Sequence, residues 1–369
     1  MKGLRKYLSP FTPDQSGAVS VLYGYGGMLI IMDAGGCVGN ICGYDEPRWE
    51  SQKSAIFSAG LRDLDAILGR DELLIRKTRQ ALSDIDVNFV GLIGTPVPAT
   101  IATDYRALKR LMEKDYGIPV LPVETNGMDL YDKGQSKAYL QLFGEFTGKD
   151  PEGESPEVGI IGATPLDQVA PDSYLELKRV ILARGHDSAV VYGEGDSIAD
   201  IRRAGQVKTN LVVSPSGLAA ARRMESLYDI PYEVGYPIAH THIRTMGGKI
   251  RECPAKRVLI IHQQVFANEI RKIVQAYSSP EAEEIDVASW FMMDEEIRQD
   301  NDAHLTEEDD LLRLVRQRNY DMIIGDPLLK RALPGWEGIW LDLPHYAVSG
   351  ELHDSKCVDD YWQKAGERR

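Results

Sequence analysis

Short apolar runs recur along most of the chain, and each is followed by a longer segment whose apolar residues have helical spacing. Runs this short suit buried strands, and their alternation with helical segments favours parallel sheets covered by helices. We expect strands at residues 28–32, 88–93 and 119–123, then at 158–161, 188–192, 210–213 and 232–234, and finally at 257–261, 285–289, 321–324 and 338–341. The predicted fold class is α/β, with three Rossmann-like domains whose mainly parallel sheets surround a central cleft.

Two polar stretches divide this pattern. Residues 148–156 (GKDPEGESP) are rich in glycine and proline and have the composition of a linker, and a second polar stretch covers residues 247–254. We therefore predict an N-terminal α/β domain over residues 1–150, a second domain over 156–250 and a third over 255–369. Within the first domain, residues 1–15 read as an extended arm, and helices are expected at 51–69, 71–82, 103–116 and 131–146.

Composition excludes several classes of protein. The 369 residues are 43% hydrophobic and 27% charged, which is ordinary for a globular chain, and the net charge of −14 argues against a nucleic-acid groove. The first residues are too polar for a signal peptide, and the longest uncharged run, 16–32, is short and glycine-rich for a membrane span. We expect a cytoplasmic protein that binds neither membranes nor nucleic acid.

The strongest candidate for a functional site lies in residues 17–49. After the apolar run at 28–32 the chain turns through Gly35 and Gly36 to Cys37, and Cys42 follows at the expected first turn of a helix. Sites in open α/β sheets are built at the carboxyl ends of strands, and thiolates near a helix N-terminus ionise easily and bind iron or zinc. The alternative is a pair of reduced, buried structural cysteines.

Other motifs narrow the chemistry further. The chain has no G-x-x-x-x-G-K-[ST] phosphate loop and no dinucleotide fingerprint, so ATP would have to be used by a partner protein. At the turn over residues 193–197 we expect Asp196 or Ser197 to cap a helix. His240 and His242 alternate as they would on one face of a strand, and His262 ends a predicted strand ahead of Gln263 and Gln264. His345 and His353 follow the last strand, and we assign no role to Cys253 or Cys357.

The cysteine turn and five later segments occur in the same order as in the nitrogenase component 1 superfamily, which this chain resembles. Members of that superfamily are ATP-dependent, multi-electron reductases. The turn ending in Gly-Gly-Cys37 is similar to its cluster-binding segment. The resemblance continues in the same order through residues 62–71 (RDLDAILGRD), 89–104 (FVGLIGTPVPATIATD), 117–127 (GIPVLPVETNG), 193–201 (GEGDSIADI) and 347–350 (AVSG). It therefore covers nearly the whole chain.

The resemblance implies an iron–sulfur cluster held in part by Cys37. Cys37 matches the middle one of three family cysteines, Pro13 falls near the first and Thr95 on the third, while Cys42 has no counterpart in nitrogenase. An eight-iron cluster is therefore not expected. A 4Fe–4S cluster needs four ligands, which Cys37 and Cys42 from two subunits would supply. Asp14 and Asp33 are possible oxygen ligands, although each is also a natural turn or cap residue.

The resemblance also bears on the substrate. At the positions that match the two cofactor ligands of nitrogenase, this chain has Ser214 and Pro344, so an iron–molybdenum cofactor is not expected. We predict instead a cavity for a small organic substrate near Thr95, Ser214, His262 and Gln264. His262 is the candidate proton donor, because histidine titrates near neutrality; the alternative is a structural histidine.

Three functions remain open on this reading. The first is the substrate-reducing component of a nitrogenase-like system, a homodimer or a heterodimer with a homologue, which receives electrons from a separate iron–sulfur ATPase. The second is a non-catalytic scaffold for assembling a metal cofactor. The third is a solute-binding module, because two Rossmann-like lobes also form a ligand clamp, but that function leaves the Gly-Gly-Cys turn unexplained.

Overall fold

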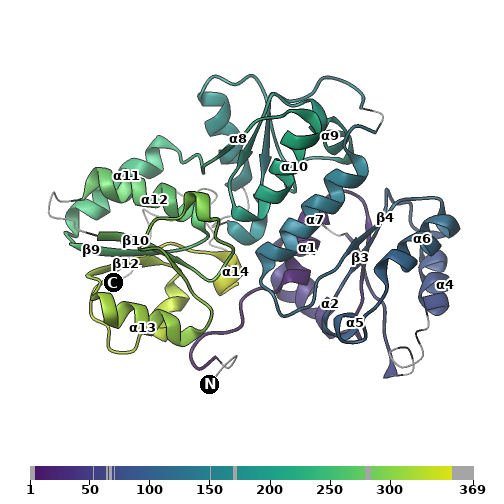
Figure 1. Cartoon of the computed structure of the whole chain (residues 1–369), viewed down its shortest axis with the longest axis horizontal. Coiled ribbons are helices and arrows are strands. Elements are labelled where there is room, and N and C mark those ends of the chain that lie inside the picture. Colours follow the sequence, from purple (N-terminus) through teal and green to yellow (C-terminus); the bar gives the residue numbers. More distant parts are fainter. Residues whose placement is uncertain are drawn as a thin grey trace.

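The computed structural model describes residues 5–52, 54–63, 65, 69, 71–149, 151–168, 173–278 and 284–350. Within these ranges the strands form three parallel sheets, each flanked by helices (Figure 1). The predicted α/β class with parallel sheets is therefore confirmed. No helix in these ranges is both long enough and apolar enough to cross a bilayer. His353 and Cys357 lie outside the described residues.

The first sheet has the strand order β2-β1-β3-β4. Its strands are β1 (Met28–Ile31), β2 (Ala55–Ser58), β3 (Val90–Ile93) and β4 (Val120–Val123). Its helices are α1 (Asp14–Leu22), α2 (Gly36–Asn40), α4 (Asp71–Leu82), α5 (Pro96–Thr100), α6 (Tyr105–Tyr116) and α7 (Tyr131–Phe146). The central strands β1 and β3 are completely buried, as expected for a sheet covered on both faces.

The helix predicted over residues 51–69 was wrong at its start. Residues 55–58 form the edge strand β2, which pairs in parallel with β1 from Met28 opposite Ala55 to Ile31 opposite Ser58. This strand is only four residues long, none of its side chains is fully buried, and its apolar run of three residues is too short to distinguish it from part of a helix. Pairing with β1 decides its conformation, because β propensity is weak next to the gain from joining an existing sheet.

The predicted strands of the second and third sheets are found to within one residue at each end, and the third sheet has one additional, unpredicted edge strand, β11 (residues 303–304). The second sheet, ordered β6-β5-β7-β8, contains β5 (Val158–Ile161), β6 (Ala189–Val191), β7 (Thr209–Val212) and β8 (Tyr232–Val234), with helices α8 (Ser173–Ala183), α9 (Ile198–Arg203) and α10 (Leu218–Tyr228). The third, ordered β11-β10-β9-β12-β13, contains β9 (Arg257–Ile261), β10 (Glu284–Ser289), β11 (Ala303–His304), β12 (Met322–Gly325) and β13 (Ile339–Asp342), with α11 (His240–Glu252), α12 (Gln264–Tyr277), α13 (Glu308–Arg318) and α14 (Tyr346–Ser349).

Helix α11 corrects two expectations. The polar stretch at 247–254 is mostly the end of this helix, and Met246 and Ile250 pack in the core of the third sheet. A Cβ on Gly247 would lie 2.2 Å from the ring of Tyr277, so glycine there serves close packing of α11 against α12. His240 and His242 lie in the first turn of this helix rather than on a strand, so they do not share a face; the first is exposed and the second is buried.

Helices α1 and α7 cross between the first and second sheets at very short range. A Cβ on Gly17 would lie 1.9 Å from the Tyr131 carbonyl oxygen, and one on Gly134 would lie 1.7 Å from the Asp14 carbonyl oxygen. Both positions therefore require glycine. The small residues at these two positions thus allow the close approach of the two helices, whereas a Cβ on Gly24 would have no described atom within 4 Å.

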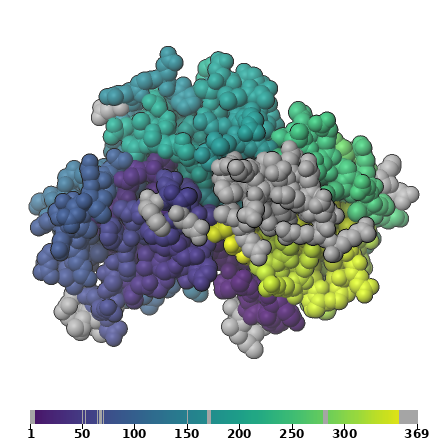
Figure 2. Space-filling model, turned by 180° about the vertical axis from the view of Figure 1, so that it is seen from behind, coloured from purple at the N-terminus to yellow at the C-terminus, as the bar shows by residue number. Residues whose placement is uncertain are grey.

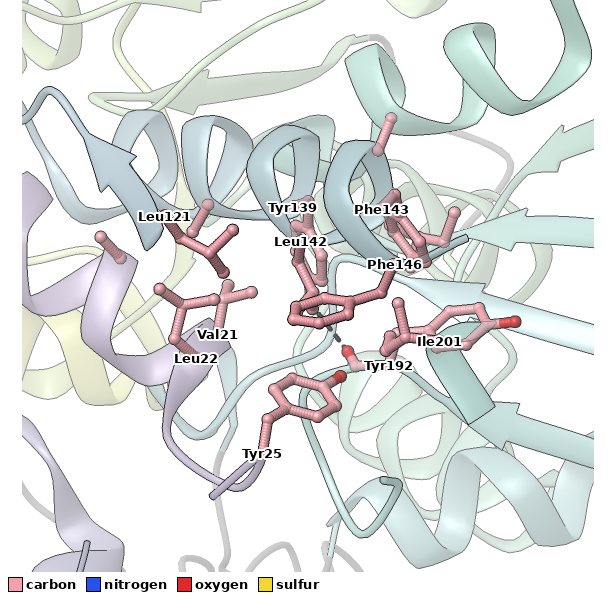
Figure 3. Packing of buried hydrophobic residues seen from close by; sticks show 14 of the residues in the cluster. Val21, Leu22, Tyr25, Leu121, Tyr139, Leu142, Phe143, Phe146, Tyr192 and Ile201 are labelled. Atoms are coloured by element: carbon pink, nitrogen blue, oxygen red, sulfur yellow. Dashed lines mark hydrogen bonds between the residues drawn. The ribbon is translucent and has the colours of Figure 1, made fainter. Parts of the chain in front are cut away.

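This crossing organises a core shared by two sheets. Figure 3 shows α1 residues Val21 and Leu22 facing α7 residues such as Leu142, with Tyr192 of the second unit packed beyond them. Phe143 meets the ring of Tyr192 edge-on at 5.0 Å. Because one hydrophobic cluster contains residues of both sheets, the first and second sheets are held in a fixed relation through α7.

The N-terminal segment ties the first sheet's helices to the third sheet. The amides of Lys6, Tyr7 and Leu8 all donate to the Glu308 carboxylate at the start of α13. Phe11 packs against Trp290, and the Thr12 amide donates to the Ala347 carbonyl in α14. Figure 2 shows this purple segment lying against the yellow C-terminal part of the chain.

Candidate functional site

The cysteine turn, residues 33–45, leaves the carboxyl end of β1. Gly35 has a φ of 113°, a left-handed conformation that favours glycine, and α2 begins directly after it. Cys37 is in the first turn of α2. Cys42 lies beyond α2, in a π-helical turn over Ile41–Asp45, and not in the first turn of a helix as predicted. Both thiols are half-buried.

Two carboxylates hold this region in shape. Asp33 accepts from the Val38 amide at 2.9 Å and from the Ser58 hydroxyl at 2.5 Å. Asp14 accepts from the amides of Asn126 and Gly127 at 2.8 and 2.7 Å. Each carboxylate therefore has both oxygens engaged with the protein, which is the turn and cap role that the sequence also allowed.

The pKa of the Cys37 thiol is raised, although we expected a thiol near a helix N-terminus to ionise easily. Burial, with a smaller contribution from the Asp33 carboxylate, raises the pKa of the Cys37 thiol, whereas a helix N-terminus alone would lower it. The protein alone therefore favours the neutral thiol at Cys37, and a bound metal ion would favour the thiolate. Among the described residues no group of three histidine, cysteine or acidic side chains is arranged to hold a metal ion. The turn of one chain offers two thiols, so a cluster held by four cysteines of such turns would need a second chain.

A second group of polar residues is buried where the three sheets meet. His345 precedes α14, and its Nε2 lies 2.9 Å from the Tyr131 hydroxyl at the start of α7. The Tyr131 hydroxyl lies 2.5 Å from an Asp167 oxygen, in the segment that follows β5. His262, at the end of β9, stacks on His345 with ring centroids 4.1 Å apart. We call these four residues the junction network.

Neighbouring groups fix the network in place. The Gln135 amide donates to Thr164 and to Asp167, and the Asp326 carboxylate accepts from the His345 amide. Burial raises the pKa of Asp167 to about 7 and lowers that of His262 to about 3. Burial, reinforced by His262, also holds the pKa of His345 well below its usual value. At neutral pH both histidines are thus neutral, and Asp167 is close to half-protonated.

Several polar atoms of this region have no hydrogen-bond partner among the described residues. They are Nδ1 of His262, Nδ1 of His345, Oε1 of Gln135, and both amide atoms of Gln168. Buried polar groups are normally paired, with water where protein groups do not suffice. The concentration of such atoms beside Asp167 indicates a place where water or a ligand makes the missing bonds.

The four residues predicted to line a substrate cavity are all almost completely buried. The side chain of Gln263, between His262 and Gln264, donates to the Val213 carbonyl beside Ser214, so the ends of β7 and β9 are adjacent. The Gln264 amide is paired with the backbone of Asp294. Thr95 lies in the first sheet, where its hydroxyl donates to the Met32 carbonyl. The fold thus brings Ser214 next to the His262 strand end and places Thr95 beside β1.

Tyr131 and Asp167 were missed by sequence reasoning. Neither residue belongs to a recognisable motif, and their proximity depends on the packing of α7 against the segment after β5. The turn at 193–197 was predicted correctly in part, because Ser197 caps α9 in a capping box with Asp200. Asp196 instead accepts from the Tyr25 hydroxyl at 2.6 Å, which links this turn to the first sheet's helices.

Comparisons with known proteins add a family assignment. A family model described as Nitrogenase component 1 type Oxidoreductase matches residues 14–282. Among solved structures, one of Nitrogenase Cp1 at pH 6.5 superposes with a TM-score of 0.70 at 10% identity, covering 97% of this chain and 89% of that one. A second, Nitrogenase Cp1 at pH 5, gives a TM-score of 0.67 at 13% identity, with coverages of 99% and 89%. No curated protein matches the sequence.

Proposed function

The chain belongs to the nitrogenase component 1 type oxidoreductase family, and we propose that it is the substrate-reducing component of a nitrogenase-like, ATP-dependent reductase system. The observation that carries this proposal is the pair Cys37 and Cys42 on one glycine turn at the carboxyl end of β1. Electrons would come from a separate iron–sulfur ATPase. A small organic molecule would be the substrate, and Ser214 at a cofactor-matching position argues against an iron–molybdenum centre.

We propose that Cys37 and Cys42 of two chains together hold one 4Fe–4S cluster. When bound, such a cluster supplies single electrons at a potential set by its surroundings. The half-buried position of both thiols would let them face a second subunit. Asp33 keeps α2 oriented through the Val38 amide, and so fixes the position of the Cys37 side chain. The partner chain could be a second copy or a homologue.

The protein's own residues would handle protons at the junction of the sheets. His262 is our candidate donor at the substrate. Burial leaves it neutral at physiological pH, so it can donate only after receiving a proton. His345 stacks on it face to face, so a water molecule in the ring planes would have to carry that proton from one ring to the other. A donor poised in this way would be protonated only when negative charge develops beside it during reduction.

Iron binding tests the first step. Protein purified and reconstituted without oxygen should contain iron and show charge-transfer absorption in the visible range. Cys37→Ala should lose both, whereas Cys253→Ala, which changes a half-buried thiol at the end of α11, should keep both. Wild-type protein that binds no iron under these conditions would refute the proposal.

Turnover tests the catalytic role against the scaffold alternative. With an ATP-dependent iron–sulfur reductase and candidate organic acceptors, the wild type should oxidise the reductase continuously. His262→Ala should slow this roughly 100-fold, the usual size of a general-acid effect. His186→Ala, which changes a partly exposed histidine away from the junction, should not slow it. A protein that loads a cluster and passes it intact to another apoprotein, without turnover, would instead be a scaffold.

A further inference from the structure

We infer that a proton-transfer path enters the molecule between α8, α11 and α12 and runs through Asp167 and Tyr131 to His345. This inference rests on the proposed function for its destination, because it describes how protons would reach the reduction site. Its geometry does not depend on that function, since every link lies within the described chain.

The path begins at a cavity between the second and third sheets. Its walls combine apolar side chains of α12 with polar groups from α8, α11 and the segment after β5. The residues that line it include Asp167, Glu176, Leu177, Tyr236, His242 and Phe266. Its volume is about 40 Å³. A water molecule needs roughly 10–15 Å³ of such space, so the cavity suits a short chain of waters and is far too small for an organic substrate.

The entrance is polar and partly open. Glu176 retains 15% exposure of its side chain and lies 2.9 Å from Nδ1 of the buried His242. The carboxylate and the imidazole are both proton-carrying groups, and the exposed part of Glu176 puts this pair in contact with bulk water. At the inner end the cavity reaches Asp167, which belongs to the junction network. The cavity therefore joins the solvent side of α8 to the buried carboxyl group.

The inner links are hydrogen bonds of ordinary or short length. Asp167 lies 2.5 Å from the Tyr131 hydroxyl, which lies 2.9 Å from Nε2 of His345. In one transfer Asp167 gives its proton to the Tyr131 oxygen while Tyr131 gives its own to His345. His345 then releases the proton on Nδ1, which has no partner among the described residues, to the substrate that is being reduced, and a hydronium ion from the cavity waters reprotonates Asp167. Return of the neutral ring to its Nδ1–H tautomer resets the path. Atoms and charges balance, and Tyr131 remains a neutral phenol.

Proton transfer from Asp167 to His345 becomes favourable only when negative charge develops near His345. Burial raises the pKa of Asp167 to about 7, so the carboxyl group carries the proton for much of the time near neutrality. Burial also depresses the pKa of His345, so it does not take that proton spontaneously. A negative charge that arrives near His345 during reduction would raise its pKa and draw the proton inward. The other titratable groups facing the path are Asp132, Glu176, Tyr236, His242, His262 and Asp326.

Infrared titration tests the path without any cluster or turnover. Asp196→Asn serves as the background, because it removes the other carboxyl group whose pKa burial raises to about 7. In this background a carboxyl signal should titrate near pH 7, and the further change Asp167→Asn should remove it. Tyr131→Phe should shift it, because the hydroxyl that contacts Asp167 is gone. Tyr139→Phe is the matched control. Tyr139 is also a fully buried tyrosine of α7, but its hydroxyl donates to the Tyr192 carbonyl at 2.9 Å.

The kinetic test uses the same variants with the reductase. Tyr131→Phe should lower turnover roughly 100-fold and increase the solvent deuterium isotope effect, with iron content and ATP hydrolysis unchanged. Tyr139→Phe should behave like the wild type. Leu177→Phe, which narrows the cavity, should slow exchange of the Asp167 proton with solvent. A carboxyl signal untouched by Asp167→Asn, or equal turnover in Tyr131→Phe and wild type, would overturn the path. Failure of the wild type to bind iron would refute the proposed function and leave the infrared result to decide the path.

Discussion

The cysteine turn and the junction network are built in opposite ways. The turn has a left-handed Gly35, half-buried thiols and an exposed Tyr44, and a Cβ added to Gly35, Gly36 or Gly39 would have no atom of the described residues within 4 Å. The network is fully enclosed, and its side chains come from the ends of elements in different sheets. A surface that must receive a second chain can be open, whereas groups that move protons must be held at fixed distances and away from bulk water.

One hydrogen bond links the cysteine turn to the residue that follows His345. The Tyr346 hydroxyl donates to the Tyr44 carbonyl at 2.5 Å, and Tyr346 directly follows His345 in the chain. The N-terminal segment reinforces this link, since Thr12 donates to Ala347 and α1 begins at Asp14. A change in the position of the cysteine turn therefore has a short route to His345.

The sharpest test of the contrast is a pair of glycine substitutions. Gly134→Ala places a Cβ 1.7 Å from the Asp14 carbonyl, so α7 must shift, and we expect a loss of about 3 kcal/mol or more in the free energy of unfolding. In Gly39→Ala the new Cβ meets no atom of the described part of the chain within 4 Å and lies inside α2, so stability should be unchanged or slightly higher. Urea denaturation of both variants measures the difference. Equal losses would show that the two regions are packed alike.

A smaller effect should appear in the dependence of stability on pH. The pKa of Asp167 is about 7 in the folded protein, above its ordinary value of 3.8, so the folded state binds the extra proton. This contribution to stability is complete below pH 3.8 and is lost as the pH rises towards 7. Asp167→Asn should remove a decline of about 2 kcal/mol between pH 5 and 7.

The comparison is made by denaturation at pH 5 and pH 8. Asp196, whose pKa burial also raises to about 7, contributes with the same sign, so Asp196→Asn is a useful second variant. The histidines act in the opposite direction: burial lowers the pKa of His262, so its contribution is lost as the pH falls from 6.5 towards 3. A variant Asp167→Asn with the same pH dependence as the wild type would mean that Asp167 is ionised throughout.

The smallest effect on stability should come from the exposed side of the cysteine turn. The Tyr44 side chain is 76% exposed, so Tyr44→Ala should change stability by less than about 0.5 kcal/mol. If this face meets a second chain, the same variant should weaken the dimer measurably in anaerobic mass measurements. Leu227→Ala, which changes a 59% exposed residue of α10, is the control and should leave the dimer intact. Dimers of equal strength in both variants would place the interface elsewhere.

Much of the fold could be predicted from local pattern alone. Helices α4 and α7 and strands β5, β8 and β9 begin and end where the pattern predicted. Strand β2 and helix α11 were missed because their local signals are weak, and the first was decided by pairing with β1 and the second by packing on α12. The site was predicted less fully. The cysteine turn, Ser197 and the strand-end position of His262 follow from the sequence, but the partners of His262 do not.

By itself, the sequence determined the α/β class, most strand positions and the glycine turn that carries Cys37, because periodicity and turn chemistry act over a few neighbouring residues. Only the tertiary structure decided that Tyr131, Asp167, His262 and His345 would meet. These residues are far apart along the chain, and their contacts depend on how α7, the segment after β5 and the third sheet pack together. Their altered pKa values follow from the same burial, which no local pattern of residues specifies.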